Sequence, residues 1–155
     1  MSNPNDANRL SFQALTGTLK AAGEATRLRI LTLLSETELT VSDLTEILRQ
    51  SQPRLSRHLR LLAEAGLVER FREGSWAFFR LGEHGSAADI AHSLIARLDP
   101  GDPVIARDRE RLAAVRSARA AAASVQPFCD MASNGGGRSK LRKRFWKFAR
   151  RIWRR

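Results

Sequence analysis

Residues 41–81 read VSDLTEILRQSQPRLSRHLRLLAEAGLVERFREGSWAFFRL, and this stretch decides the fold. In its first half, leucines recur at helical spacing on either side of a short polar break, which predicts two helices joined by a tight turn. In its second half, residues 67–81 form two β-rich runs around Glu73-Gly74-Ser75, which predicts a β-hairpin. The expected fold class is therefore mainly α with a small β-hairpin.

The ends of the two central helices carry recognisable signals. Thr40-Val41-Ser42-Asp43 matches a capping box, with a hydroxyl at the N-cap and an acid three residues later. This predicts a helix to about Leu48. Ser51 is a good N-cap, and proline is tolerated in the first turn, so Ser51-Gln52-Pro53 predicts a second helix to about Ala65.

Further helices are expected over residues 11–22, 25–34, 85–98 and 104–125, from the spacing of their apolar residues and from helix propensity. Gly23 is expected to end the first of these in the left-handed C-cap conformation. The predicted organisation is a mobile arm (1–10), a main domain that holds the first helices and the hairpin (11–98), a helical extension (99–125) and a basic tail (126–155). SNGGG, residues 133–137, is a flexible linker in that tail.

The charge of the 155-residue chain is unevenly distributed. There are 27 Lys and Arg against 16 Asp and Glu, a net charge of +11. Residues 1–100 hold 12 basic and 12 acidic residues, whereas residues 125–155 hold 10 basic and one acidic. The chain's single cysteine excludes an internal disulfide, and neither a signal peptide nor a long apolar run is visible, so we expect a cytoplasmic location.

One helix face is basic within the otherwise neutral first hundred residues. Residues 49–60 contain four arginines and no acid, and they lie opposite an apolar side formed by Leu55, Leu59 and Leu62. Arginine binds phosphate and reads guanine, and serine and glutamine contact phosphates or base edges, so this pattern predicts a recognition helix for the DNA major groove. An ordinary solvated arginine face is the alternative. The expected major-groove contacts are Ser51, Gln52, Arg54, Ser56, Arg57 and His58, with Arg54 and Arg57 reading guanine. The expected phosphate contacts are Arg60 and, in the hairpin, Arg70, Arg72 and Arg80.

Three pieces carry a family resemblance: ATRLRILTLL (25–34), SQPRLSRHLRLLAEAGLV (51–68) and REGSWAFFRL (72–81). In this order and spacing they resemble the ArsR (arsenical-resistance-repressor-like) family of bacterial transcription regulators, over about residues 12–98. The resemblance implies a winged helix-turn-helix homodimer. Such a dimer binds an inverted-repeat operator in double-stranded DNA and represses transcription until an inducer, which this sequence does not identify, releases it.

The resemblance also implies a dimer interface built from the first and last helices of the domain. Two apolar stripes suit it, and the alternative is that they complete the core of a monomer. The residues concerned are Phe12, Leu15, Leu19, Ile90, Leu94 and Leu98.

Metal-sensing members of that family carry cysteines in a motif that here reads ELTVSDL (38–44). Thr40 and Ser42 stand where thiolates would be needed, and hydroxyls are poor ligands for soft metals. A second family site uses Asp-x-His, but Asp89 and His92 are three residues apart and no further histidine follows. We therefore expect neither a metal site nor a cofactor. Cys129 is either incidental or forms an intermolecular disulfide.

No catalytic constellation is visible, so an enzyme is not expected. Residues 108–123, DRERLAAVRSARAAAA, resemble the helix that joins the DNA-binding domain to a methyltransferase domain in longer family members. This chain ends about thirty residues later, either as a natural short form or because the last thirty residues derive from a shifted reading frame.

The tail predicts one more amphipathic helix over residues 140–155. Its apolar stripe is surrounded almost entirely by Lys and Arg, so the tail suits an anionic surface: nucleic-acid backbone, a membrane or a groove on a partner. The alternatives are a tail without a role, or a chain that acts as a membrane- or partner-binding adaptor. The stripe consists of Leu141, Phe145, Phe148, Ala149 and Ile152.

Overall fold

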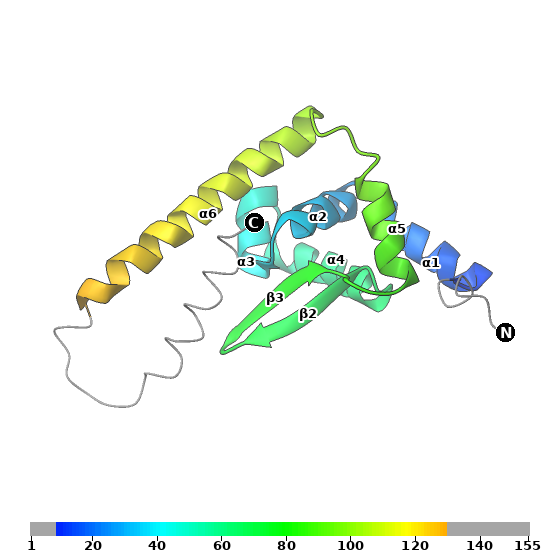
Figure 1. The fold of residues 1–155 in the computed structure, drawn as a ribbon, viewed down its shortest axis with the longest axis horizontal. Helices are drawn as coiled ribbons and strands as arrows, with labels where there is room; N and C mark the ends of the chain where they lie inside the picture. The colour runs from blue at the N-terminus through cyan, green and yellow to red at the C-terminus, as the bar shows by residue number, and fades with distance from the viewer. Residues whose placement is uncertain (1–8, 130–155) are drawn as a thin grey trace. The chain divides into compact units, whose positions relative to one another are not determined.

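The computed structural model describes residues 9–129 (Figure 1). The chain divides into two compact units, Met1–Val115 and Arg116–Arg155. The central helix pair and the hairpin lie in the first unit. The order of elements is α1 (Phe12–Ala22), α2 (Ala25–Glu36), β1 (Leu39–Thr40), α3 (Val41–Leu48), α4 (Gln52–Glu64), β2 (Val68–Glu73), β3 (Trp76–Leu81), α5 (Ser86–Ile95) and α6 (Pro103–Cys129). The prediction of a mainly helical chain with a small hairpin is confirmed.

Helix α2 is the centre of the first unit. It contacts α1, α4, α5 and β3, so it is covered on most of its sides. Four successive apolar or hydroxyl positions, from Leu31 to Leu34, are all buried, as is Ile30. This continuous burial from Ile30 to Leu34 places α2 at the centre of the core, and α2 provides the surface on which α4 is positioned.

Helices α3 and α4 pack through the leucines that the periodicity predicts. Leu55 and Leu62 on α4 are fully buried, as are Leu44 and Ile47 on α3. Complete burial of such a side chain stabilises the folded state by about 1.5–3 kcal/mol relative to leaving the side chain exposed. This packing fixes which side of α4 faces outward.

The hairpin belongs to a three-stranded antiparallel sheet with the strand order β1-β3-β2. Strand β1 pairs with β3 through Leu39 and Phe79, and sequence reasoning did not predict it, since two residues are too few to show alternation. Strands β2 and β3 pair from Val68 with Leu81 to Glu73 with Trp76. The resulting two-residue turn places Gly74 at a φ of 61°, which glycine adopts without steric cost.

The predicted capping box at the start of α3 is confirmed. The Thr40 hydroxyl accepts from the Asp43 amide at 3.2 Å, and the Asp43 carboxylate accepts from the Thr40 amide at 2.6 Å. Both residues are buried. The start of α3 is therefore held by its own side chains.

Two helix ends lie where the sequence predicts them, but the expected capping interactions are absent. Gly23 has a φ of −76°, so the first helix does not end in a left-handed cap. A Cβ on Gly23 would lie 3.0 Å from the Leu19 carbonyl oxygen, so glycine is needed there for close approach. Ser51 is the N-cap of α4 by position, but its side chain makes no capping hydrogen bond.

The first half of α6 packs onto the domain. Ile105, Leu112 and Val115 are buried, and Asp102 accepts from the amide of Val104 at 2.8 Å at the start of the helix. Within the described residues, no helix is long and apolar enough to cross a membrane. The predicted linker at 133–137 and the predicted helix at 140–155 lie outside the described residues.

Candidate nucleic-acid interface

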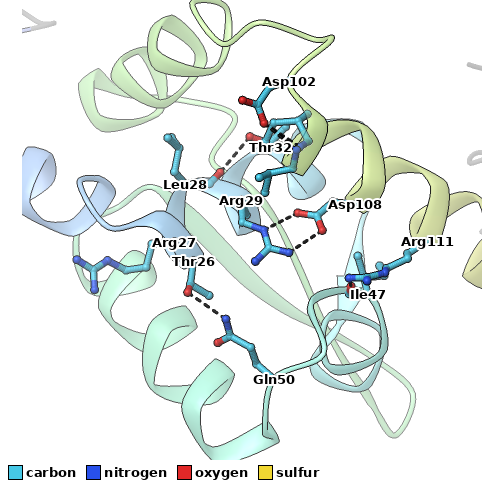
Figure 2. A network of polar contacts seen from close by, with 12 residues as sticks. Thr26, Arg27, Leu28, Arg29, Thr32, Ile47, Gln50, Asp102, Asp108 and Arg111 are labelled. Carbon is cyan, nitrogen blue, oxygen red and sulfur yellow. Dashed lines mark hydrogen bonds and ion pairs between the residues drawn. The ribbon is translucent and has the colours of Figure 1, made fainter.

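The turn between α3 and α4 is tight and tied to the core. Arg49 caps α3 in the left-handed conformation with a φ of 52°, and its amide donates to the Thr45 carbonyl at 3.0 Å. The Gln50 side-chain amide donates to the Thr26 hydroxyl at 3.1 Å, as Figure 2 shows. Because Thr26 lies in the first turn of α2, this bond anchors the turn to the central helix.

Helix α4 presents its polar side chains opposite the buried leucines. No acid lies in its first turn, and no side chain caps its N-terminus. Unpaired N–H groups at a helix N-terminus attract anions, so this end of α4 suits phosphate. The exposed polar residues on α4 and at its cap are Ser51, Gln52, Arg54, Ser56, Arg57 and Arg60.

Arg60 is the most distant of these from the N-terminus. Its guanidinium is 3.7 Å from the Glu64 carboxylate one turn later, and its side chain is 70% exposed. An exposed pair at this spacing is weak, so Arg60 can exchange Glu64 for another anion at little cost.

His58 does not lie on the exposed face. Its side chain is only 12% exposed, and its Nδ1 lies 3.7 Å from the Glu24 carboxylate at the N-cap of α2. Burial lowers the pKa of His58, Glu24 opposes that effect, and the nearby arginines reinforce it. The imidazole therefore lies against the start of α2 and is not part of the exposed face that carries Arg54 and Arg57.

The hairpin arginines divide between two environments. The register places Arg70 opposite Phe79 and Arg72 opposite Ala77, on one face of the hairpin, and both arginines are exposed. On the other face, Phe71 stacks on Phe78 with ring centroids 5.7 Å apart.

Arg80 lies on that second face and is held by carboxylates. It donates to Glu69 at 2.7 and 2.9 Å and to Glu83 at 3.0 Å, and its guanidinium lies 5.5 Å from the Phe71 ring centroid. The hydrogen bond to Glu69 raises the pKa of Arg80 and lowers that of Glu69. Arg80 is thus already paired within the hairpin, unlike the exposed Arg70 and Arg72.

The apolar stripe on α1 is uncovered. Phe12 is 87% exposed, and Leu15 and Leu19 are exposed as well, so these residues do not complete the core of the first unit. On the other predicted stripe, Ile90 and Leu94 are half-buried in α5. Leu98 is also half-buried but lies beyond the end of α5, which is shorter than predicted.

The four positions that were compared with metal-ligand motifs are Thr40, Ser42, Asp89 and His92. Thr40 is committed to the capping box, and Ser42 is exposed in the first turn of α3. Asp89 and His92 are both exposed on α5. Among the described residues, no three His, Cys, Asp or Glu side chains come close enough together to hold a metal ion. Cys129 is the last residue of α6.

Sequence reasoning overlooked two residues that position α4. Glu24 and Gln50 hold His58 and the turn through contacts that join distant parts of the sequence. One signal was available, because His58 is three residues from Leu55 and four from Leu62, which places it on the apolar stripe of α4.

A helix pair with a tight turn, an outward-facing second helix and an adjoining β-hairpin define a winged helix-turn-helix protein. The sequence profile of the "Bacterial regulatory protein, arsR family" matches residues 24–70. The chain is 36% identical over 85 residues to the arsenical resistance operon repressor of Staphylococcus aureus, covering 55% of this chain and 81% of that protein. The chain belongs to the arsR family of bacterial regulatory proteins.

Two further known proteins are similar to about half of this chain. The chain is 46% identical over 76 residues to the arsenical resistance operon repressor of Escherichia coli K12, covering 48% of this chain. The match spans 65% of that relative's length, slightly less than two thirds. The solved structure of the transcriptional repressor BigR from Xylella fastidiosa is 32% identical, with a TM-score of 0.49, over 54% of this chain and 82% of that chain.

Proposed function

We propose that the protein is a sequence-specific DNA-binding transcriptional regulator of the repressor type. The observation that carries this proposal is the exposed polar face at the N-terminal end of α4, opposite the buried leucines. Arg54 and Arg57 project from this face and suit bidentate contacts with guanine. Family membership and the repressor relatives support the same function.

The proposed contacts divide by type. Ser51, Gln52 and Ser56 contact the major groove beside the two reading arginines. Arg60, Arg70 and Arg72 contact phosphates, which positions the protein without reading sequence. His58 and Arg80 are left out of the direct contacts, because one faces the core and the other is paired with carboxylates.

We also propose that the active form is a homodimer bound to an inverted repeat. The uncovered stripe on α1 supports it, since a largely exposed phenylalanine and two exposed leucines favour burial against a second copy. A two-fold dimer places its two recognition helices about 34–36 Å apart, which is one turn of the duplex.

Selection of duplexes from a random-sequence pool with the full chain tests this function. We expect an inverted-repeat duplex to be enriched and to bind at least about a thousandfold more tightly than a shuffled duplex. Binding to both duplexes should weaken with salt, and the preference should persist. The selected duplex, placed over a promoter, should then reduce transcription when the protein is added.

A double variant, Arg54→Ala with Arg57→Ala, serves as the matched control. It should lose the preference for the selected duplex while keeping part of its affinity for the shuffled one. Enrichment of no sequence, or equal binding of both duplexes by the unmodified chain, would contradict the proposal.

A further inference from the structure

Helices α2 and α4 meet at a polar junction next to the exposed polar face of α4 that we propose binds DNA. Glu24 caps α2 by accepting from the Arg27 amide at 2.9 Å, and the same carboxylate faces His58 on α4. The Gln50–Thr26 hydrogen bond joins this junction to the turn before α4. The contacts made by these polar side chains therefore help to set the orientation of α4 on α2.

The junction is incompletely bonded. Both ring nitrogens of His58 are buried, and neither has a hydrogen-bond partner among the described residues. The 3.7 Å between His58 Nδ1 and the Glu24 carboxylate exceeds the normal hydrogen-bond range of about 2.7–3.2 Å. A protonated imidazole would convert this loose contact into a charge-assisted hydrogen bond after a shift of less than about 1 Å.

The charged groups around His58 come from both helices. On α2, Glu24 favours the protonated ring and Arg27 opposes it. On α4, Arg54 and Arg57 oppose it, and burial opposes it more strongly than any of them. Two of the three opposing cations are therefore the arginines proposed to read DNA.

We propose that Glu24 and His58 are a proton-linked positioning pair, in which His58 takes up a proton when α4 binds DNA and thereby closes onto Glu24. This inference rests on the proposed function, since it needs α4 to bind DNA. Phosphates and guanine acceptors would compensate the charges of Arg54 and Arg57 and would add negative potential nearby. The ring is already buried against α2, so DNA adds little further desolvation.

The uptake of a proton determines the direction in which DNA affinity changes with pH. A group that binds a proton on complex formation makes the complex tighter as pH falls. His58 is neutral in the free protein near pH 7, because its pKa lies below the usual value. Affinity for the selected duplex should consequently increase as pH decreases from about 8 to about 6, across the usual range of histidine.

The experiment uses the full chain in a background with His84→Gln and His92→Gln, which leaves His58 as the only histidine of the three. Affinity for the selected duplex is measured across that pH range, with proton uptake from calorimetry in buffers of different ionisation enthalpy. We expect the Kd to fall several-fold and at most about tenfold toward pH 6. The NMR chemical shifts of the His58 ring carbons should show a protonated ring in the complex at a pH where the ring is neutral in the free protein.

Two variants identify the pair. His58→Gln should abolish the pH dependence that the background retains, and Glu24→Gln, which keeps the α2 cap acceptor, should reduce it. An unchanged pH dependence in His58→Gln, or a pH-independent Kd in the background, would overturn the inference. If His58→Gln does not fold, the chemical shift and the proton uptake of the background still decide the question. A chain that prefers no duplex would instead contradict the proposed function itself.

Discussion

Arg29 and Asp108 form a bidentate ion pair between α2 and α6. Arg29 Nε and Nη2 each donate to a different Asp108 oxygen at 2.6 Å, and the Asp108 side chain is only 3% exposed (Figure 2). The hydrogen bond to Asp108 raises the pKa of Arg29. Nearby, Arg111 donates to the Ile47 carbonyl at 3.1 Å near the end of α3. The first half of α6 thereby contacts both the central helix and the helix before the recognition helix.

Breaking this pair should destabilise the domain. We expect Asp108→Asn to lower the free energy of unfolding by about 3 kcal/mol, because it leaves a largely desolvated guanidinium without its counter-charge. Urea unfolding followed by circular dichroism measures the change. Glu110→Gln, at an exposed position of the same helix, is the control and should stay within about 0.5 kcal/mol. Equal midpoints for both variants would show that the contact adds no stability.

Arg57→Ala should impair both affinity and base discrimination. We expect a loss of about 1–3 kcal/mol in binding to the selected duplex, with relaxed preference at one position of each half-site. A binding assay against duplexes mutated at each position measures both effects. Arg97→Ala, an exposed arginine outside α4 and the hairpin, should change neither. If Arg57→Ala binds like the unmodified protein with the same preferences, Arg57 does not read bases.

Arg70→Ala should act differently, through phosphate alone. The selected and the shuffled duplex should weaken by about the same factor, and the slope of log affinity against log salt should decrease by about one. Salt titrations of both duplexes measure this slope. A loss confined to the selected duplex would assign Arg70 to base reading instead.

Arg80→Gln should change the pH dependence of stability. Arg80 lowers the pKa of Glu69, so the pair stabilises the fold above the ordinary glutamate pKa and loses that effect as pH falls through the lowered value. Since both side chains are partly exposed, we expect a difference of about 0.5–1 kcal/mol at neutral pH, declining in acid. Thermal unfolding at neutral pH and below pH 4 compares the two proteins. A difference that grows in acid would show the opposite linkage.

Phe12→Ser should weaken dimerisation without destabilising the monomer, because the ring is largely exposed within one chain. Sedimentation equilibrium measures the association constant. Trp76→Ser is the matched control, since Trp76 is 63% exposed but lies at the tip of the hairpin. An unchanged association constant in Phe12→Ser would place the dimer contact elsewhere.

The predictable parts of this fold are those set by local sequence. Leucine spacing located α3 and α4, and the Thr40–Asp43 box marked the start of α3 correctly. The two-residue strand β1 and the Arg29–Asp108 pair depend on partners about 40 and 79 residues away, which periodicity does not reveal. At the candidate site, the exposed arginines of α4 followed from the helical pattern. The inward position of His58 and the pairing of Arg80 depend on tertiary neighbours.

The Thr40–Asp43 capping box constrains how a descendant of this protein could acquire a pair of thiols at residues 40 and 42. Ser42→Cys changes an exposed side chain and should be nearly neutral, within about 0.5 kcal/mol. Thr40→Cys would remove a buried hydroxyl cap at a cost of about 1 kcal/mol. The two substitutions are unequal, so evolution toward such a pair would favour a cysteine at residue 42 first, while the helix that precedes the recognition helix keeps its cap.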